Sequence, residues 1–408
     1  MKPMGPIPAG FESADGELLM GGRTVSALVA EAGDTPLFVY SRERISAQYR
    51  RLRAAMPAQL AIHYAMKANP FGPLLVHMNS LVDGFDIASG GELQLALAAG
   101  VDPARISFAG PGKRDREIAA AIEQGVTLHS ESEGEVERAL AIGRRLGIVP
   151  KIAVRVNPSF DLKGSGMKMG GGAKQFGVDQ DRVPALVRHL IAQGADWRGF
   201  HIYAGSQALK ADAIIDTQSQ TIDLAAALAG EISAKPAHVN LGGGYGIPYF
   251  PGDAPLDIDA IGDALRRKFS ALPAILRDSA FCIELGRYLV GEAGVYLTRI
   301  VDRKISHGET FLIVDGGLHH QLAASGNFGT VVRRNYPIAV AGKFDADADE
   351  VASVVGCLCT PLDLLGNQVA LPLADVGDII AIFCAGAYGA SASPSGFLGQ
   401  GPARELLV

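Results

Sequence analysis

Short apolar runs alternate with helical patterns between residues 60 and 285, and this alternation limits the possible folds more than any other feature. The runs are rich in β-branched residues and lie near 60–66, 82–87, 105–109, 126–129, 150–156, 198–203, 237–241 and 281–285. Eight strand-helix units over about 250 residues predict a (β/α)8 barrel. In such a barrel the active site forms at the carboxyl ends of the strands, so residues there are the first candidates for chemistry.

Helix start signals between the runs support this reading. Ser89 and Glu92 form a capping box that opens a helix, and Gly100 closes it. Two later helical patterns are longer and lie at 211–229 and roughly at 257–278.

Beyond Glu284 the pattern changes, because strand-like runs follow one another with little helical periodicity. They lie at 294–301, 310–314, 351–357 and 378–384. We therefore predict a barrel domain over 30–280 and a mainly β domain made of 1–29 plus 281–408. The extended segment before residue 30 is expected to join the β domain.

Composition excludes several classes of function. With 48% apolar and 20% charged residues the chain is typical of a soluble globular protein, and its net charge of −6 gives no argument for binding nucleic acid or an anionic membrane. No window approaches 18 uninterrupted apolar residues, and the first residues show no secretory signal. Four scattered cysteines favour a reducing compartment, so we expect a cytoplasmic protein.

Lys67 ends the apolar run 61–66 and precedes an Asn-Pro pair. Most lysines are solvated and take no part in chemistry, and this is the alternative to keep in mind. A lysine buried at the mouth of a strand has a lowered pKa and a nucleophilic amine, which forms Schiff bases. We expect Lys67 to be buried in this way.

Polar residues stand at most of the other strand ends, more often than chance would place them there. In chain order these are Asp86, the Gly110–Gly112 turn, His129, Arg155 with Asn157, Tyr203 with Ser206, Gly242–Gly244, and Glu284 with Arg287. The bland alternative for Glu284 and Arg287 is a simple ion pair at a strand end.

The glycine loop Gly242–Gly246 follows the seventh strand, where barrels often bind phosphate. It fails the dinucleotide fingerprint, and no helix is expected to begin there. Three consecutive glycines offer bare N–H groups to an anion, although a flexible turn is the alternative. A second glycine-rich stretch, 164–177, is no P-loop and is expected to form a mobile loop over the site.

A metal site is not expected. Cys357 and Cys359 lack a second cysteine pair, and His319 and His320 are adjacent rather than at ligand spacing.

Together these motifs resemble the fold-type III pyridoxal-phosphate decarboxylases, the family of diaminopimelate, ornithine and arginine-type enzymes. The resemblance runs through nearly the whole chain and rests on 64–69, 84–89, 205–207, 241–246, 284–288, 356–363 and 386–389. Further motifs at 315–320 and 323–329 look like a narrower branch, which accompanies exosortase and exopolysaccharide gene clusters. That branch is similar to enzymes that decarboxylate glutamate attached to an acyl carrier protein.

The resemblance implies a role for each matching residue. Lys67 would hold pyridoxal phosphate as an internal aldimine, and Glu284 would face the pyridine nitrogen and make the cofactor a strong electron sink. Arg155 and Asp86 would support the ring hydroxyl and the lysine. The phosphate would be bound by Ser206, Gly243, Gly244, Arg287 and Tyr388.

Cys359 matches the cysteine that reprotonates the carbanion in the family. It would reach the barrel of a second subunit, so a homodimer with shared active sites is implied. The alternative is a buried cysteine of the β domain. Where the family usually stacks a histidine on the ring this chain has Tyr203, and the nearby His201 is displaced by two positions.

Thr360 narrows the substrate. Family members that act on ornithine or diaminopimelate carry an acidic residue directly after the cysteine, where it pairs with the distal amine. Threonine cannot pair with a cation, so lysine, ornithine and diaminopimelate are not expected as substrates. Arg333, Arg334 and Tyr336 lie where the family recruits contacts to the substrate carboxylate, and Arg287 is a further substrate candidate.

The sequence therefore predicts a pyridoxal-phosphate-dependent decarboxylase of an α-amino acid, which is free or carried on an acyl carrier protein. Two alternatives stay open. One is a racemase or epimerase on the same fold, against which Glu284 argues because the racemases place an arginine there. The other is a non-catalytic homologue that acts as a regulator, although such proteins typically lose the lysine or the cysteine.

Overall fold

The computed structural model describes residues 1–328 and 333–408. It divides the chain into two compact units. The barrel unit comprises 49–246 and 256–286, and the β unit comprises 1–48, 247–255 and 287–408. These bounds differ from the predicted 30–280, because the strand Leu37–Tyr40 pairs within the β unit and the strand Ala280–Leu285 within the barrel.

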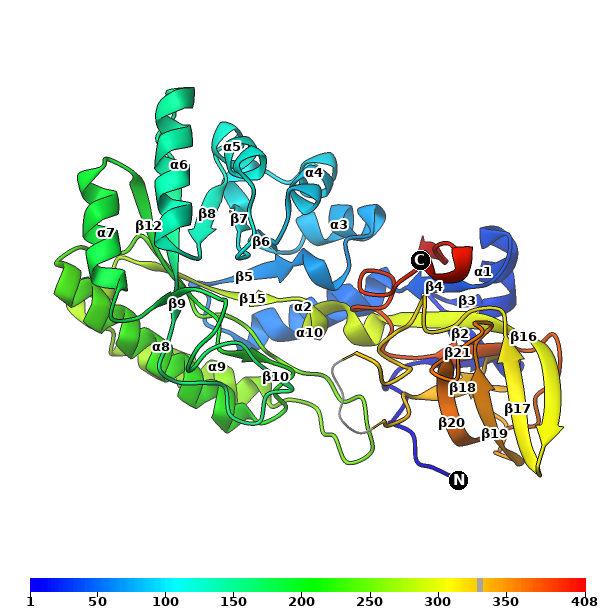
Figure 1. Ribbon diagram of the computed structural model, residues 1–408. Helices are drawn as coiled ribbons and strands as arrows, with labels where there is room; N and C mark the ends of the chain where they lie inside the picture. Colours follow the sequence, from blue (N-terminus) through cyan, green and yellow to red (C-terminus); the bar gives the residue numbers. More distant parts are fainter. Residues whose placement is uncertain (329–332) are drawn as a thin grey trace. The chain divides into compact units, whose positions relative to one another are not determined.

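Eight parallel strands close into a barrel, as the alternation predicted (Figure 1). Every neighbouring pair is parallel, and the pairing of β8 with β9 completes the ring. The strands are β5 (Leu60–Ala65), β6 (Gly84–Ile87), β7 (Ile106–Phe108), β8 (Thr127–Ser130), β9 (Lys151–Asn157), β12 (Asp196–Ile202), β14 (His238–Asn240) and β15 (Ala280–Leu285).

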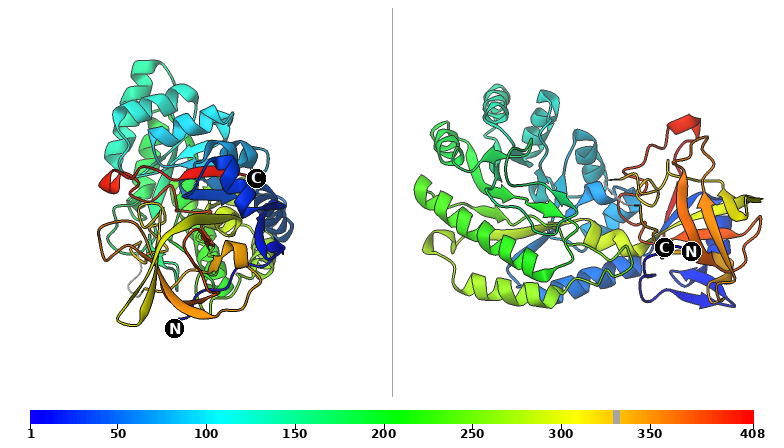
Figure 2. Two further views of the ribbon diagram at one scale, coloured as in Figure 1. Left: turned by 90° about the vertical axis from the view of Figure 1, so that its right-hand side faces the viewer. Right: turned by 60° about the horizontal axis from the view of Figure 1, so that its bottom comes forward.

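Helices surround the outside of the barrel (Figures 1 and 2). The expected cap at Ser89 is present, since its hydroxyl accepts the backbone N–H of Glu92 at the start of α4. Gly147 ends α6 in a left-handed conformation. The helices are α2 (Arg42–Ala55), α3 (Gly72–Asn79), α4 (Gly90–Ala98), α5 (Asp115–Gln124), α6 (Glu133–Leu146), α7 (Val183–Ala192), α8 (Ala211–Ile232) and α9 (Ile258–Ser270).

The β unit holds a mixed sheet in the order β18-β21-β16-β17-β19-β20, to which β4 and β22 add. A small sheet of β1, β2 and β3 also belongs to this unit. The strands are β1 (Glu12–Ala14), β2 (Glu17–Met20), β3 (Arg23–Thr24), β4 (Leu37–Tyr40), β16 (Gly294–Ser306), β17 (Glu309–Val314), β18 (Ile338–Val340), β19 (Glu350–Val355), β20 (Leu364–Leu371), β21 (Ile379–Ile382) and β22 (Arg404–Leu407). The predicted fold class, a (β/α)8 barrel followed by a mainly β domain, is confirmed.

The prediction of an extended segment before residue 30 is wrong at its end, where α1 (Val25–Ala32) forms. Thr24 caps this helix by accepting the N–H of Ala27, and Leu28 and Val29 are buried on one face. A helical spacing of apolar residues after a threonine was the signal that pointed to this helix.

The glycine-rich stretch 164–177 is partly regular. Its strand β10 (Met167–Lys168) pairs antiparallel with β13 (Gly205–Ser206). Directly after the stretch, β11 (Val178–Asp179) adds to β9. The stretch is therefore tied by backbone hydrogen bonds to the segment that carries Ser206.

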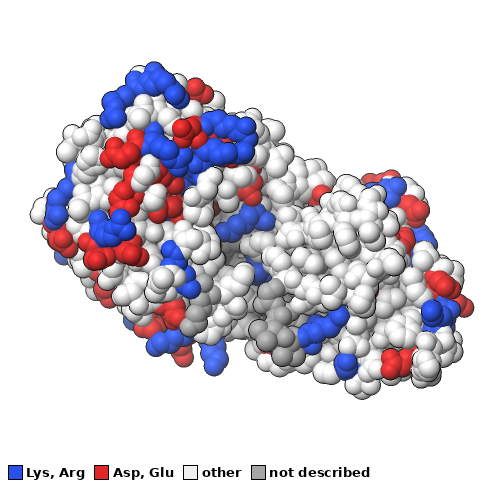
Figure 3. All heavy atoms as spheres, viewed as in Figure 1, with Lys and Arg blue, Asp and Glu red and all other residues white. Residues whose placement is uncertain are grey.

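No helix among the described residues is long and apolar enough to cross a membrane. On the face of the barrel unit shown in Figure 3, basic and acidic side chains are interspersed over the helices.

Candidate active site

The carboxyl ends of the barrel strands carry the predicted residues of the barrel unit. Lys67 lies in a 3-10 turn (Met66–Ala68) directly after β5, Asp86 lies on β6, and Arg155 lies near the end of β9. Glu284 lies near the end of β15, where its Cα pairs with His63 of the neighbouring strand β5. Strand register thus brings residues from distant parts of the sequence to one end of the barrel.

Lys67 is exposed, so the expected burial of this lysine is wrong. The turn that holds it is tightly packed underneath, because a Cβ on Gly286 would lie 2.7 Å from the Cβ of Ala68. The Lys67 amine lies 5.5 Å from the centre of the Tyr203 ring. A close-packed turn therefore presents the exposed Lys67 beside an aromatic face.

Glu284 is a buried carboxylate, 6% exposed. Its Oε2 accepts a hydrogen bond of 3.1 Å from Asn240 Nδ2 and lies 3.2 Å from His201 Nε2. Burial alone raises the pKa of Glu284, but its neighbours outweigh this, and the pKa falls well below its usual range. His201 contributes most to the lowering, and Lys67 and Arg155 add to it, so the carboxylate is ionised.

His201 and His129 lie behind this carboxylate inside the barrel. His201 is 1% exposed, and its Nδ1 lies 3.1 Å from Nδ1 of His129. Burial and the neighbouring His201 hold the pKa of His129 well below its usual value. Sequence reasoning treated His201 as a displaced ring-stacking residue and did not find its contact with Glu284. The available signal was the alternation of side chains, because His201 on β12 and Tyr203 just after its end are two positions apart and would point to the same side.

Arg155 lies in a second polar cluster at the same end. Its Nη1 donates to Glu131 Oε1 at 2.8 Å, and its guanidinium lies 4.8 Å from the Phe176 ring and 6.0 Å from the Tyr203 ring. Glu131 also accepts the backbone N–H of Gly110 at 2.6 Å. Burial raises the pKa of Glu131, but its neighbours lower that pKa by more. The charge of Arg155 has the largest lowering effect, so the pKa of Glu131 is below its usual value.

Asp86 contacts His63 and Ser107. Its Oδ2 lies 3.3 Å from His63 Nδ1, and the Ser107 hydroxyl donates to its Oδ1. Gly84 makes room for this arrangement, because a Cβ there would lie 2.6 Å from His63 Nε2. The glycine two residues before Asp86 is thus explained by the imidazole beside it.

Ser206 and two glycines form a cradle at the ends of β12 and β14. The Ser206 hydroxyl oxygen is buried and has no hydrogen-bond partner among the described residues. A Cβ on Gly243 would lie 1.9 Å from the carbonyl oxygen of Glu284, and one on Gly244 would lie 2.4 Å from that of Gly205. Gly244 also has φ of +90°, so only glycine fits at both positions.

Arg287 and Tyr388 lie in the β unit. Arg287 Nη1 donates to Tyr249 Oη at 2.7 Å, and its guanidinium lies 4.6 Å from the Tyr388 ring. Tyr336 packs 4.8 Å from Tyr249, measured between ring centres. Burial raises the pKa of Tyr249 to about 12, so this phenol keeps its hydrogen. Sequence reasoning missed Tyr249, which no motif marks.

Cys359 is exposed on a turn held by Asp363. The Asp363 carboxylate accepts the backbone N–H groups of Leu358 at 2.8 Å and Leu318 at 2.6 Å. A Cβ on Gly356 would lie 2.1 Å from Asp363 Oδ2, which explains the glycine that opens the motif. Cys359 is therefore not the buried cysteine that the alternative interpretation required.

The predicted substrate residues are spread over the β unit. Thr360 is half-buried next to Cys359, and Arg334 lies 3.8 Å from the Phe250 ring. Arg333 is half-buried, and its Nη2 is buried without a hydrogen-bond partner among the described residues. Gly329, the last residue of the motif 323–329, lies outside the described residues.

No group of three or more His, Cys, Asp or Glu side chains in the described part of the chain is arranged to hold a metal ion.

A closed parallel barrel with a lysine, a buried carboxylate and a glycine cradle at one end defines a class of cofactor-dependent barrel enzymes. Residues 42–291 match the family model "Pyridoxal-dependent decarboxylase, pyridoxal binding domain". The chain belongs to this family of pyridoxal-dependent decarboxylases, and its barrel is a pyridoxal-phosphate-binding domain.

Curated relatives extend the match beyond the barrel. The L-glutamyl-[BtrI acyl-carrier protein] decarboxylase of Niallia circulans is 36% identical over 386 residues, which cover 92% of this chain and 89% of that protein. The diaminopimelate decarboxylase of a Neisseria meningitidis serogroup A strain is 33% identical and covers 93% and 91%. Among solved structures, diaminopimelate decarboxylase from M. jannaschii in complex with L-lysine aligns with a TM-score of 0.87. That structure is 26% identical and covers 98% of this chain and 93% of its own.

The side chains and glycines of the barrel unit suit pyridoxal phosphate. The unpartnered Ser206 hydroxyl and the two crowded glycines suit a phosphate group. The ionised Glu284 suits a protonated ring nitrogen, and the Tyr203 ring beside the Lys67 amine suits a flat ring.

Proposed function

We propose that this chain removes the α-carboxylate of an amino acid that has no distal ammonium group, with L-glutamate attached to a carrier protein as the leading candidate. The observation that carries the proposal is Thr360 directly after Cys359. In the diaminopimelate and ornithine enzymes of the resemblance an acidic residue stands there and pairs with a distal amine. A relative named for a carrier-linked glutamyl substrate, 36% identical over most of both chains, supports the same choice.

The chemistry of the linkage narrows the candidate further. A decarboxylase breaks the bond between the α-carbon and its carboxylate and adds a proton to that carbon. A glutamyl group joined to its carrier through the α-carboxyl has no α-carboxylate to lose. We therefore propose that the substrate is joined through its side-chain carboxyl, so that an aminobutyryl group stays on the carrier.

The roles we propose for the barrel residues are those that the resemblance implies, and the geometry of the site supports them. Pyridoxal phosphate, when bound, supplies a ring that accepts the electron pair left by departing carbon dioxide. Lys67 holds the cofactor through its amine, and Glu284 faces the ring nitrogen with a charge that keeps a proton there. Tyr203 supports the ring face, and Arg155 and Asp86 support the ring hydroxyl and the lysine.

We propose that the phosphate is bound by Ser206, Gly243 and Gly244 and by Arg287 and Tyr388. The buried Ser206 hydroxyl without a partner and the arginine flanked by Tyr388 support these roles. Charge-assisted hydrogen bonds of this kind are among the strong ones in proteins.

Cys359 is proposed to give its thiol proton to the α-carbon after carbon dioxide leaves, from the second subunit of a homodimer. Its exposure on a turn fixed by Asp363 supports a role in reaching outward. Arg333, whose Nη2 is buried without a partner among the described residues, is proposed to bind a substrate carboxylate or carbonyl, with Tyr336 and Thr360 as further contacts. Cytoplasmic location and a link to exopolysaccharide pathways stay predictions.

The experiment is product analysis with a substrate panel. The panel holds free L-glutamate, ornithine, lysine, meso-diaminopimelate and L-glutamyl-acyl carrier protein linked through the side-chain carboxyl. We expect carbon dioxide and an aminobutyryl-carrier product, with no turnover of the three distal amines. Turnover of a distal amine at a comparable rate would contradict the substrate class.

Two controls sharpen this test. Thr360→Asp restores a carboxylate beside Cys359 and is expected to add distal-amine turnover at the expense of the carrier-linked substrate. Loss of optical activity without carbon dioxide would instead identify a racemase.

A further inference from the structure

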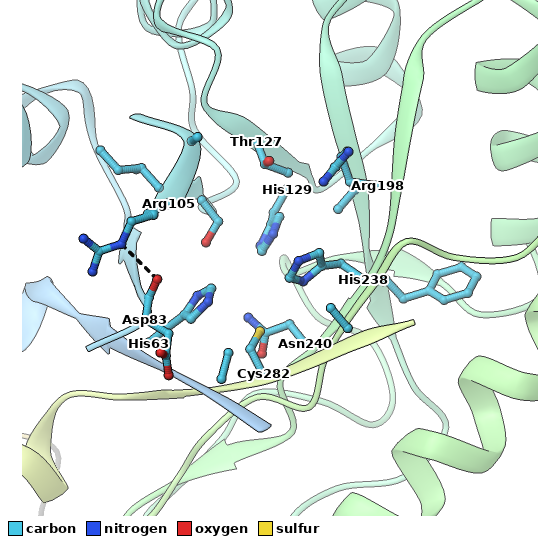
Figure 4. A pocket seen from close by; sticks show the side chains of 16 residues that line it. His63, Asp83, Arg105, Thr127, His129, Arg198, His238, Asn240 and Cys282 are labelled. Atoms are coloured by element: carbon cyan, nitrogen blue, oxygen red, sulfur yellow. Dashed lines mark hydrogen bonds between the residues drawn. The ribbon is translucent and has the colours of Figure 1, made fainter. Parts of the chain in front are cut away.

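A cavity of about 300 Å³ lies inside the barrel at the amino-terminal ends of the strands (Figure 4). This is the opposite end from the residues assigned to the cofactor. Its rim includes the exposed residues Asp83, Ala104 and Ala280, each at or just before the start of a strand. The cavity is therefore a separate entrance into the barrel interior from the amino-terminal side.

The inner wall of this cavity is polar. His63, His129 and Asn240 line it together with Cys282 and Ser107, and Figure 4 shows the imidazoles of His63 and His129 directed toward its centre. A cavity of this volume holds up to about ten water molecules at liquid density, and polar walls give such water its hydrogen bonds.

The cavity and the cofactor site are successive layers of the same interior. Side chains two positions apart on a strand share a face, so Cys282 in the cavity wall is followed on that face by Glu284. In the same way Ala153 of the wall is followed by Arg155. The layer of side chains with Glu284 and Arg155 is thus adjacent to the layer that lines the cavity.

Two continuous contacts cross this boundary. Asn240, a wall residue, donates directly to Glu284 Oε2 at 3.1 Å. His129, also a wall residue, lies 3.1 Å from His201 Nδ1, and His201 Nε2 lies 3.2 Å from the same carboxylate oxygen. His201 itself is 1% exposed, so the two imidazoles form a buried chain from the carboxylate to the cavity.

The donor and acceptor pattern of this chain is constrained. His201 Nε2 lies 3.2 Å from Glu284 Oε2 and has no other partner among the described residues, so the charge of the carboxylate favours a hydrogen on that nitrogen. Between the two Nδ1 atoms one must donate and the other accept. With a hydrogen on His201 Nε2, its Nδ1 accepts from His129 Nδ1. One proton moves along the chain when His129 Nε2 takes up a proton from cavity water, the His129 Nδ1 hydrogen passes to His201 Nδ1, and the His201 Nε2 hydrogen passes transiently to the carboxylate. The reverse steps return it.

Several charged or titratable groups act on Glu284 and His129. Lys67 and Arg155 act on Glu284, and Lys113 and His63 act on His129.

We propose that His201 is a positioning residue that orients the ionised Glu284 carboxylate, and that His129 and His201 form the path by which the His201 Nε2–H facing this carboxylate exchanges with water in the amino-terminal cavity. The role of the carboxylate toward the ring nitrogen rests on the proposed function. The imidazole chain and the cavity rest on the geometry alone.

The test is nuclear magnetic resonance of the purified protein with 15N-labelled histidine side chains. We expect the His201 Nε2–H resonance to shift when Glu284 is changed to Gln. The matched control is Glu92→Gln. It alters a carboxylate of the same unit that accepts the backbone N–H of Ala88. An unchanged His201 resonance in Glu284→Gln would overturn the pairing.

The path is tested by the exchange of the His201 Nε2–H with water. His129→Phe removes the only ring nitrogens that link His201 to the cavity among the described contacts, and exchange is expected to slow about tenfold. His129→Leu is the second variant if phenylalanine does not pack. His238→Gln, which alters another wall residue, is expected to leave exchange unchanged. Equal exchange in the wild type and in both His129 variants would overturn the path.

The positioning role is tested by substitution at His201 itself. His201→Gln keeps an N–H donor near Glu284, and His201→Leu removes it. We expect pyridoxal phosphate to bind His201→Leu about tenfold more weakly and His201→Gln nearly as well as the wild type. Equal affinity in all three proteins would overturn the positioning role. A protein with the paired resonances but no cofactor binding would contradict the proposed function and not the imidazole chain.

Discussion

Lys67 was predicted from its position in the sequence, but its proposed role does not depend on the burial that made the position attractive. Its place after an apolar strand pointed to it, but burial is not what distinguishes it, since the side chain is exposed. What distinguishes it is a turn packed against Gly286 and an aromatic ring 5.5 Å from its amine. Reach and placement, rather than desolvation of the lysine, account for its proposed role as anchor.

Glu284 is the reverse case, because its identity was predictable and its support was not. A carboxylate at the end of the eighth strand could be read from the sequence. Its neighbours His201, which lowers its pKa most, and Asn240, which donates a hydrogen bond to it, come from two other strands and depend on register. Register is a tertiary property, so periodicity within one strand does not contain it.

Cys359→Ala is expected to keep the cofactor and to lower kcat at least about tenfold, because the variant lacks the proposed proton donor. Cofactor absorbance and kcat, measured on the same preparation, check this. Cys357→Ala, two residues away and half-buried, is the control and is expected to keep its kcat. Equal kcat in Cys359→Ala and the wild type would remove this thiol from the mechanism.

At the scale of elements, the strands were predictable and the connections only partly so. All eight barrel strands fall within a few residues of the predicted runs, because buried parallel strands are short apolar segments with few other interpretations. Helix α1 was missed in a segment expected to be extended. The pairing of β10 with β13 was also missed, because two-residue strands leave no periodic signal.

Gly244→Ala is expected to weaken pyridoxal phosphate binding by more than about tenfold, because a Cβ would lie 2.4 Å from the Gly205 carbonyl oxygen and strain the cradle. Equilibrium titration with the cofactor measures this. Gly172→Ala is the matched control, since Gly172 is also left-handed but has nothing within 4 Å. If both variants bind equally well, the crowding at Gly244 is not functional.

The barrel should lose the contribution of the half-buried His238 to its stability as the pH falls. Burial lowers the pKa of His238 from 6.5 to about 4, so the unfolded chain binds a proton there at higher pH than the folded chain does. This histidine's contribution to stability is present above pH 6.5 and is lost as the pH falls from 6.5 toward 4. By about pH 5 the loss is at most about 2 kcal/mol.

The thermal midpoint at about pH 7.5 and about pH 5 measures this loss. His238→Asn is expected to show a smaller drop between the two values than the wild type. His307→Asn replaces an exposed histidine and is expected to leave the drop unchanged. A drop in His238→Asn as large as in the wild type would contradict the assignment.

For the whole molecule, the fold class was predictable because two patterns, strand-helix alternation and then strands alone, follow one another in the chain. The bounds of the two units were less predictable. Segments far apart in sequence, including 1–48 and 247–255, join the β unit. Which segments belong to this unit depends on strand pairing, as when β4 pairs with β16 nearly 260 residues later. The identity of the substrate could not be predicted from the motifs, because among them only Thr360 distinguishes one class of substrate from another.

A homodimer with shared sites predicts complementation between inactive variants. Lys67→Ala and Cys359→Ala subunits, mixed and allowed to exchange, should recover about a quarter of the wild-type activity, since about half of the dimers are mixed and each has one intact site. Each variant alone and a mixture kept from exchanging are the controls. Activity no higher than the sum of the controls would contradict shared sites.

The central claim is that Lys67 holds pyridoxal phosphate in a decarboxylase, and one measurement tests it most directly. The protein is loaded with the cofactor, treated with borohydride to fix the cofactor to the lysine that holds it, digested, and mapped by mass spectrometry. We expect a pyridoxyl group on Lys67 and none in Lys67→Ala. A label on a different lysine, or no label in a protein that still releases carbon dioxide from its substrate, would contradict it.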